Sequence, residues 1–267
     1  MEQGLSSIFV DNEFIDNRNF TALHKLASGI SSSANVRLDD YLSVNDSELD
    51  AQDTLGRTPL SYAAGNGDPA KVSALLRHGA EPNVADRMGA APLHCAAEKG
   101  SAACLDLLLD AGANIDAVSK NGHTALVEAA SSGQVECIEL LLTRGADVAI
   151  TDVAGRQALY MAVTCQQPAS LLPLIRGGAN INARRKNGGT ALKEAVFLGS
   201  ATMARCLVEH GADLDCLEGF FGCVRHEGDS CACIALVKEL ERMVEDNNMT
   251  VLSDEDVDSF YDAAESL

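Results

Sequence analysis

The ten residues TPLSYAAGNG, from Thr58 to Gly67, return along the chain at a fixed interval. Each matching segment begins 33 residues after the one before it, at Ala91, Thr124, Gln157 and Thr190. A Gly-Ala dipeptide keeps the same interval, with its glycine at positions 79, 112, 145, 178 and 211. Self-similarity at a fixed period of this length indicates a repeat architecture.

The residue types within one repeat explain how it folds. Thr58 suits a helix N-cap, and Pro59 suits the first helical position, where no amide donor is needed. Gly67 suits the left-handed cap that ends this helix. A second apolar run at 72–76 has helical spacing, and residues 86–89 form a tight turn that leads into the next repeat. Each unit is therefore predicted to be helix, turn, helix and hairpin-like loop.

A single repeat has an apolar face that nothing within the repeat covers, so neighbouring repeats have to stack. Small side chains on the first helices allow those helices to approach closely. They are the alanines at 63, 64, 96, 97, 129 and 130. The absence of Trp and an aromatic content of 4% also favour thin helical layers over one thick core.

The order D-x-x-G-x-T-P-L-x-x-A-A-x-x-G, followed by L-L-x-x-G-A-D/N, resembles the ankyrin repeat. The match is tight from Asp53 to Cys216 and looser at both ends. The resemblance implies an all-α ankyrin-repeat solenoid of about six to seven helix-turn-helix repeats with hairpin-like loops. The segment FVDNEFIDNRNFTALHKL at 9–26 also resembles the leading segment of ankyrin proteins from filamentous fungi.

From this pattern we divide the chain into five segments. Residues 1–15 form a lead-in, 16–52 a first, longer and divergent repeat, 53–216 five regular repeats, 217–246 a degenerate C-terminal capping repeat and 247–267 an acidic tail. The fifth unit departs from the pattern at Gln157 and Gln166, where Thr and Gly are usual, and its stability is therefore in doubt.

The charge of the chain is uneven. The formal net charge is −19, and residues 217–267 alone hold 13 acidic and 3 basic side chains. Such a balance repels phosphate groups and argues against nucleic acid or an anionic membrane as a partner. The chain begins with no basic flank and holds no apolar run long enough for a membrane span. We expect a cytoplasmic or nuclear protein whose nine cysteines are reduced.

No motif of an enzyme active site is present, and we expect no catalysis, no cofactor and no small-molecule substrate. One cluster, Cys216, Cys223, His226, Cys231 and Cys233, has the residue types of a zinc site. Its spacing is not a usual zinc spacing, so packed thiols are the favoured interpretation and zinc the alternative. Cys104, Cys137 and Cys206 are also predicted to be structural.

The histidines have structural explanations, with one exception. His24 and His94 occupy the slot where ankyrin proteins use the imidazole to bond between loops and helices. His78 and His210 precede a helix-ending glycine, where a helix C-terminus favours a cation. His123 is expected to project from a hairpin tip.

Ankyrin proteins usually meet their partners at the hairpin tips and the exposed side of the first helices. By position, this resemblance implies a partner-binding set that is basic and partly apolar. The set is Leu55, Arg57, Asn66, Arg87, Met88, Lys99, Lys120, Asn121, His123, Val153, Arg156, Lys186, Asn187 and Phe197. Arg184 and Arg185 lie beside it, and the alternative is that all of these are ordinary solvated tips.

The sequence therefore favours a monomeric, non-catalytic protein-protein interaction module: a scaffold, an adaptor or an inhibitor. A basic, partly apolar surface suits an acidic or amphipathic segment, either of another protein or of this chain's own tail. In the tail, Val257, Phe260, Tyr261 and Ala264 share one helical face, although a frayed, solvated tail is the simpler interpretation. Two further alternatives remain: a regulatory relative of a larger ankyrin-containing enzyme or receptor, and a zinc or thiol protein.

Overall fold

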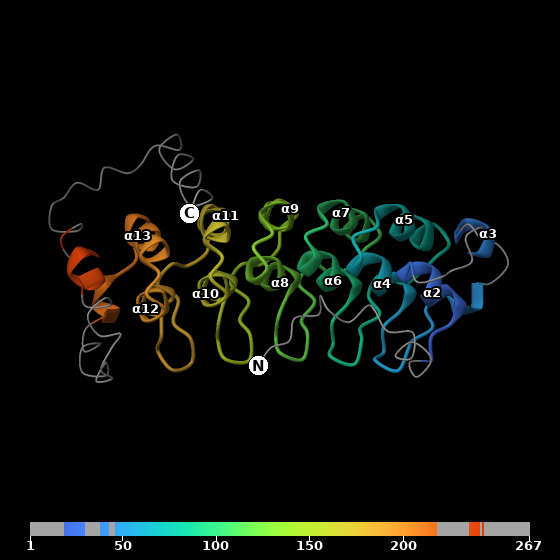
Figure 1. The fold of residues 1–267 in the computed structure, drawn as a ribbon, viewed down its shortest axis with the longest axis horizontal. Helices are drawn as coiled ribbons and strands as arrows, with labels where there is room; N and C mark the ends of the chain where they lie inside the picture. Colours follow the sequence, from blue (N-terminus) through green and yellow to red (C-terminus); the bar gives the residue numbers. More distant parts are fainter. Residues whose placement is uncertain (1–18, 30–37, 43–45, 218–234, 241, 243–267) are drawn as a thin grey trace. The chain divides into compact units, whose positions relative to one another are not determined.

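The computed structural model describes residues 19–29, 38–42, 46–217, 235–240 and 242. The chain divides into two compact units, unit 1 (Met1–Lys120) and unit 2 (Asn121–Leu267). The lead-in at 1–15, the tail at 247–267 and most of the capping repeat at 217–246 lie outside the described residues. Figure 1 shows the described elements as helices and connecting loops, with no β-strand among them.

Unit 1 consists of three helix pairs. Their first helices pack side by side, α2 on α4 and α4 on α6, and their second helices do the same, α3 on α5 and α5 on α7. The elements are α2 (Ala22–Ser28), α3 (Leu38–Leu42), η2 (Asp46–Glu48), α4 (Pro59–Gly65), α5 (Pro69–Arg77), α6 (Pro92–Lys99) and α7 (Ala102–Asp110).

Unit 2 repeats this arrangement with three more pairs. The first helix α10 packs between α8 and α12, and the second helix α11 packs on α9. The elements are α8 (Ala125–Ser131), α9 (Val135–Thr143), α10 (Ala158–Thr164), η3 (Pro168–Ser170), α11 (Leu171–Arg176), α12 (Ala191–Phe197), α13 (Ala201–Glu209) and η4 (Leu214–Leu217). The all-α expectation is thus confirmed for the described residues of both units.

The predicted N-caps form where the sequence has threonine. The hydroxyl oxygen of Thr58 accepts a hydrogen bond from the amide of Ser61 at 3.2 Å, and Thr124 and Thr190 cap α8 and α12 in the same way. At Ala91, which has no hydroxyl, α6 lacks this side-chain cap, and Nδ1 of His94 accepts a hydrogen bond from the Ala91 amide at 3.1 Å. Each first helix of these repeats therefore begins at the expected residue.

The cores consist of small aliphatic side chains, as the composition indicated. The six alanines at positions 63, 64, 96, 97, 129 and 130 have no exposed surface. Leucines such as Leu75 and Leu108 on the second helices of unit 1 are equally inaccessible. Because interiors are close-packed, an alanine between two helix backbones leaves no room for a larger side chain.

The fifth helix pair has weaker local signals than its neighbours. Gln157 stands at the N-cap of α10 without a side-chain capping bond, and Gln166 adopts a left-handed φ of 55°. The second helix of the pair starts with the 3₁₀ turn η3 and contains Pro173. These features agree with the doubt that the sequence raised about this pair, because a side chain in the left-handed region is strained.

Ala97→Leu should lower the stability of the protein, because the added methyl groups have to enter the contact of α6 with α4. We expect a loss of about 1–3 kcal/mol in the free energy of unfolding. Urea titration followed by circular dichroism measures it. Ala103→Leu, at an exposed position of α7, is the matched control and should leave the midpoint almost unchanged.

Gln166→Gly should raise the stability, because glycine adopts a positive φ without steric cost. We expect a gain of about 1 kcal/mol, read as a higher urea midpoint. Thr164→Gly, two residues earlier in the helical region of α10, should instead lower the midpoint. A loss of stability in both variants would contradict the assignment of strain to Gln166.

Candidate protein-binding surface

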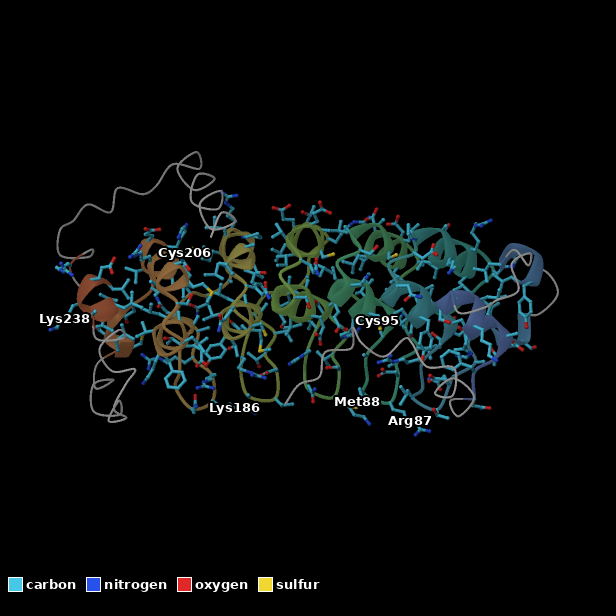
Figure 2. All side chains as sticks on the ribbon, viewed as in Figure 1. Arg87, Met88, Cys95, Lys186, Cys206 and Lys238 are labelled. Carbon is cyan, nitrogen blue, oxygen red and sulfur yellow. The ribbon has the colours of Figure 1, made fainter. Side chains whose placement is uncertain are left out.

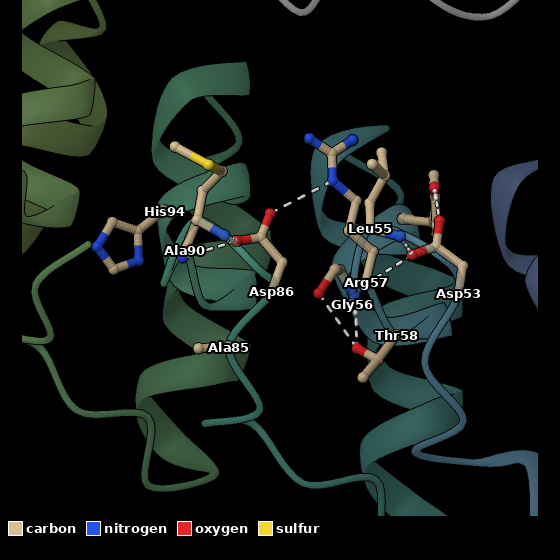
Figure 3. A network of polar contacts seen from close by, with 12 residues as sticks. Asp53, Leu55, Gly56, Arg57, Thr58, Ala85, Asp86, Ala90 and His94 are labelled. Carbon is tan, nitrogen blue, oxygen red and sulfur yellow. Dashed lines mark hydrogen bonds and ion pairs between the residues drawn. The ribbon is translucent and has the colours of Figure 1, made fainter. Parts of the chain in front are cut away.

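Three of the hairpin loops are organised by a carboxylate at their start. In unit 1, Oδ1 of Asp53 accepts the backbone amides of Leu55 and Arg57, both at 2.8 Å, while Oδ2 accepts the hydroxyl of Tyr62 at 2.7 Å. The next carboxylate, Asp86, binds the amides of Met88 and Ala90 in the same way (Figure 3).

Asp152 makes the equivalent bonds in unit 2, with the amides of Ala154 and Arg156 at 2.8 Å. Burial alone would raise the pKa of the Asp152 carboxyl. Hydrogen bonds from the backbone and side chain of Arg156 and from the backbone of Ala154, together with the charge of Arg156, hold that pKa below its usual range. The carboxylate is therefore charged while it fixes the loop.

Neighbouring hairpins within a unit are joined through their backbones. In unit 1 the amide of Arg87 donates to the carbonyl of Leu55, and the amide of Lys120 to that of Met88, both at 2.8 Å. Gly56 permits the approach: it has a φ of 80°, and a Cβ there would lie 2.9 Å from the Arg87 nitrogen. The hairpin tips of unit 1 therefore form a fixed row.

In unit 2 the amide of Val153 donates to the carbonyl of Asn121, and the amide of Lys186 to that of Ala154, both at 3.0 Å. At Gly122 a Cβ would lie 2.8 Å from the Cα of Asp152, so this hairpin contact also requires glycine. The tips of unit 2 are fixed in the same manner as those of unit 1.

Unit 1 exposes apolar and basic side chains along this row. Met88 is 56% exposed and Leu55 37% exposed, and Arg87, Lys99 and Lys120 are exposed as well. Figure 2 shows Arg87 and Met88 at the loop end of the unit. The carboxylates of Asp53 and Asp86 are turned inward and bonded, so the positive charges dominate the surface of the tips.

Unit 2 has a comparable set of exposed side chains. Val153 is 60% exposed on its hairpin tip and Phe197 is 67% exposed at the end of α12. Lys186, labelled in Figure 2, is exposed, and its Nζ donates to the carbonyl of Val153 at 2.6 Å. Asn121 and Asn187 are exposed at tips too.

Three members of the expected partner-binding set are engaged within the fold. Arg57 pairs with the carboxylate of Asp86 at 3.5 Å, and its side chain is only 17% exposed. The amide group of Asn66 donates to the carbonyl of Ser28 at 3.0 Å. In unit 2, Arg156 pairs with Asp152 at 2.6 Å. These residues join neighbouring repeats or brace a hairpin, which is a structural role beside the partner-binding role that the sequence predicts for them.

The position of His123 also differs from the expectation that it projects from a hairpin tip. Its ring lies inward, with Nδ1 3.0 Å from Oε1 of Glu128 and Nε2 3.8 Å from Oδ2 of Asp152. The hydrogen bond with Glu128 raises the pKa of His123, with Asp152 acting in the same direction. Burial and the positive charge of Arg156 oppose the rise.

One exposed apolar residue was not in the partner-binding set that the sequence predicted. Val118 is 53% exposed, two positions before Lys120 in the hairpin of unit 1. The sequence held a signal for this exposure: Val118 is a larger apolar residue in a loop slot that holds Ala85, Thr151 and Arg184 in other repeats.

The cysteines within the described residues form no disulfide with one another. Burial raises the pKa of Cys104, and it raises that of Cys206 to about 12, so neither thiol is a nucleophile at neutral pH. Cys216 is half-buried, and the four other members of the expected cluster lie outside the described residues. Within the part of the chain that is described, no group of His, Cys, Asp and Glu could hold a metal ion.

A shallow pocket of unit 2 is too small and open for a ligand. Its enclosed space has room for little more than a water molecule. Tyr160 and Arg185 line it, and both are engaged: the Arg185 guanidinium lies 5.1 Å from the Tyr160 ring, and Glu194 contacts both side chains.

The fold and this surface define a class of protein: a stack of helix pairs that presents rigid hairpin loops. The family model for ankyrin repeats (three copies) matches residues 30–119 and 111–185. The chain belongs to the ankyrin-repeat family. A search of curated proteins gave no match.

Among solved structures, the chain is similar to the ankyrin repeat domain of Bcl-3, described as a unique member of the IκB protein family. The two share 33% sequence identity with a TM-score of 0.64, over 74% of this chain and 89% of the Bcl-3 chain. This similarity, like the family match, confirms the ankyrin fold.

As for membranes, every helix in the described residues is too short or too polar to span a bilayer.

The His123 contacts predict a stability that depends on pH. The folded-state pKa lies above the usual value near 6.5, so the protonated ring stabilises the fold fully below that pH. The contribution is lost as the pH rises through the folded-state pKa. We expect His123→Gln to lower the urea midpoint more at about pH 5.5 than at about pH 8.5. An equal loss at both would contradict a charged His123–Glu128 pair.

Proposed function

We propose that this protein is a non-catalytic interaction module, a scaffold, adaptor or inhibitor, that binds another protein through its hairpin tips and first helices. One observation carries the proposal. The hairpin backbones are fixed by buried carboxylates and by bonds to the next hairpin, while Met88 and Val153 at their tips are exposed. A loop that is ordered before binding loses little entropy when a partner docks.

The charge of the tips suggests the chemistry of that partner. In unit 1, three cations are exposed and have no ion pair within the described residues: Arg87, Lys99 and Lys120. The carboxylates of Asp53 and Asp86, in contrast, accept hydrogen bonds from backbone amides of their own loops. A surface with basic groups around apolar side chains suits an acidic or amphipathic segment. We also propose that the protein acts as a monomer in the cytosol or nucleus, where cysteines are kept reduced.

The experiment is affinity capture with a surface variant that leaves the structural arginines in place. Arg87, Lys99, Lys120 and Lys186 are all changed to Glu, while Arg57 and Arg156 are kept because they pair with Asp86 and Asp152. A protein captured by the natural chain should be lost, or bound at least about 10-fold more weakly by titration, because attraction becomes repulsion.

A matched variant reverses four basic residues away from the tips, Arg77, Arg176, Lys238 and Arg242. It should bind like the natural chain, and circular dichroism should show that both variants are folded. The proposal fails if the same protein binds the tip variant and the natural chain with equal affinity.

A further inference from the structure

The surface of unit 2 carries a group of exposed side chains around the hairpin that precedes α12. Lys186 reaches the carbonyl of Val153, so a cation and an apolar side chain lie together at the tips. Arg184 is exposed beside them. On α12, Lys193 and Phe197 stand four residues apart and therefore share one face. We call these five residues the unit 2 surface.

The C-terminal sequence of the same unit is complementary to this surface. Residues 250–267 hold six acidic side chains and no Lys, Arg or His. Val257, Phe260, Tyr261 and Ala264 have the spacing of one helical face, and Asp258, Asp262 and Glu265 have the spacing of the neighbouring face. The segment therefore combines apolar side chains, which can cover the apolar residues of the unit 2 surface, with carboxylates, which can face its cations.

The connection is long enough to allow the contact. Arg205 on α13 pairs with Glu239 at 2.6 Å, which fixes the chain at 239 against the last described helix pair. Twelve residues separate 242 from Asp254 and span up to about 40 Å when extended. The helices of that pair are about 14 Å long and the arm of its hairpin adds about 20 Å, so the tips lie within reach.

We propose that the acidic segment 250–267 docks on the unit 2 surface of its own chain and competes there with a partner protein. The apolar face of the segment covers exposed apolar side chains of this surface, and the carboxylates face Lys186, Arg184 and Lys193. This regulation rests on the proposed function of the same surface. Because the segment is tethered, its effective concentration is about millimolar, so even weak docking occupies the surface in the absence of a partner.

The first test joins carboxylates to lysines in the intact chain with a zero-length carbodiimide reagent, followed by mass spectrometry of the monomer. We expect bonds between Lys186 or Lys193 and acidic residues at 254–265, with a loss of at least about 10-fold at about 1 M salt, where ionic contacts are screened. Acylation of the free lysines in a parallel sample verifies that both react. Reactive lysines without such bonds, or bonds from the segment only to lysines elsewhere, overturn the proposal.

The second test titrates a fluorescent peptide of residues 250–267 into two intact chains. One is the natural chain, and the other carries Asp258→Asn, Asp262→Asn and Glu265→Gln. The altered chain should bind the peptide at least about 10-fold more tightly, because its own segment no longer competes. A control chain with Glu81→Gln, Glu136→Gln and Glu139→Gln has the same change in net charge and should bind like the natural chain. Equal affinity for all three chains overturns the proposal.

The two ideas fail in different ways. If the crosslinks form but no protein binds at the tips, docking stands and the proposed function fails. If a partner binds the tips with the same affinity before and after the three substitutions in the segment, the docking fails and the proposed function stands.

Discussion

The constraint on which the rest of the structure depends is that no helix pair buries its apolar face alone. In unit 1, α4 is covered only because α2 and α6 lie on its two sides, and the contact is close because Ala63, Ala64, Ala96 and Ala97 carry no more than a methyl group. Stability in such a protein comes from each pair and from its contacts with adjacent pairs. The fifth pair, with a strained Gln166 and an uncapped α10, is therefore a weak link whose neighbours in unit 2 supply its support.

The hairpins turn this stacking into a binding surface. A carboxylate at the start of a hairpin bonds two amides of its own loop, and backbone bonds join that loop to the next one. The acidic side chain is thus used internally, while the residues beside it point outward. This division explains how a chain with a net charge of −19 can present basic tips. The acids in the loops stabilise the fold, and a large share of the remaining acids lies in the C-terminal region.

In the docking that we propose, the acidic segment 250–267 competes with a partner protein for the basic surface of its own chain. A basic, apolar surface that stays uncovered would attract many acidic segments, whereas a tethered segment of matching chemistry admits only partners that bind more tightly than it does. Specificity would then depend on a difference between two affinities rather than on one strong contact.

The sequence by itself determined the repeat, its helices and the small residues between them, because these follow from local chemistry at a 33-residue period. Thr58 caps the first helix of its repeat, Pro59 is the first residue of that helix, and Ala97 is small enough to pack between helices. It also indicated which loops meet solvent. It could not separate exposed cations from engaged ones. Arg57 and Arg87 both lie in hairpin loops of unit 1, yet Arg57 is held by Asp86, 29 residues away, and Arg87 is exposed. Only the tertiary structure decided this, because the carboxylate that holds Arg57 belongs to the adjacent repeat, and the stacking of the hairpins sets the distance between the two charges.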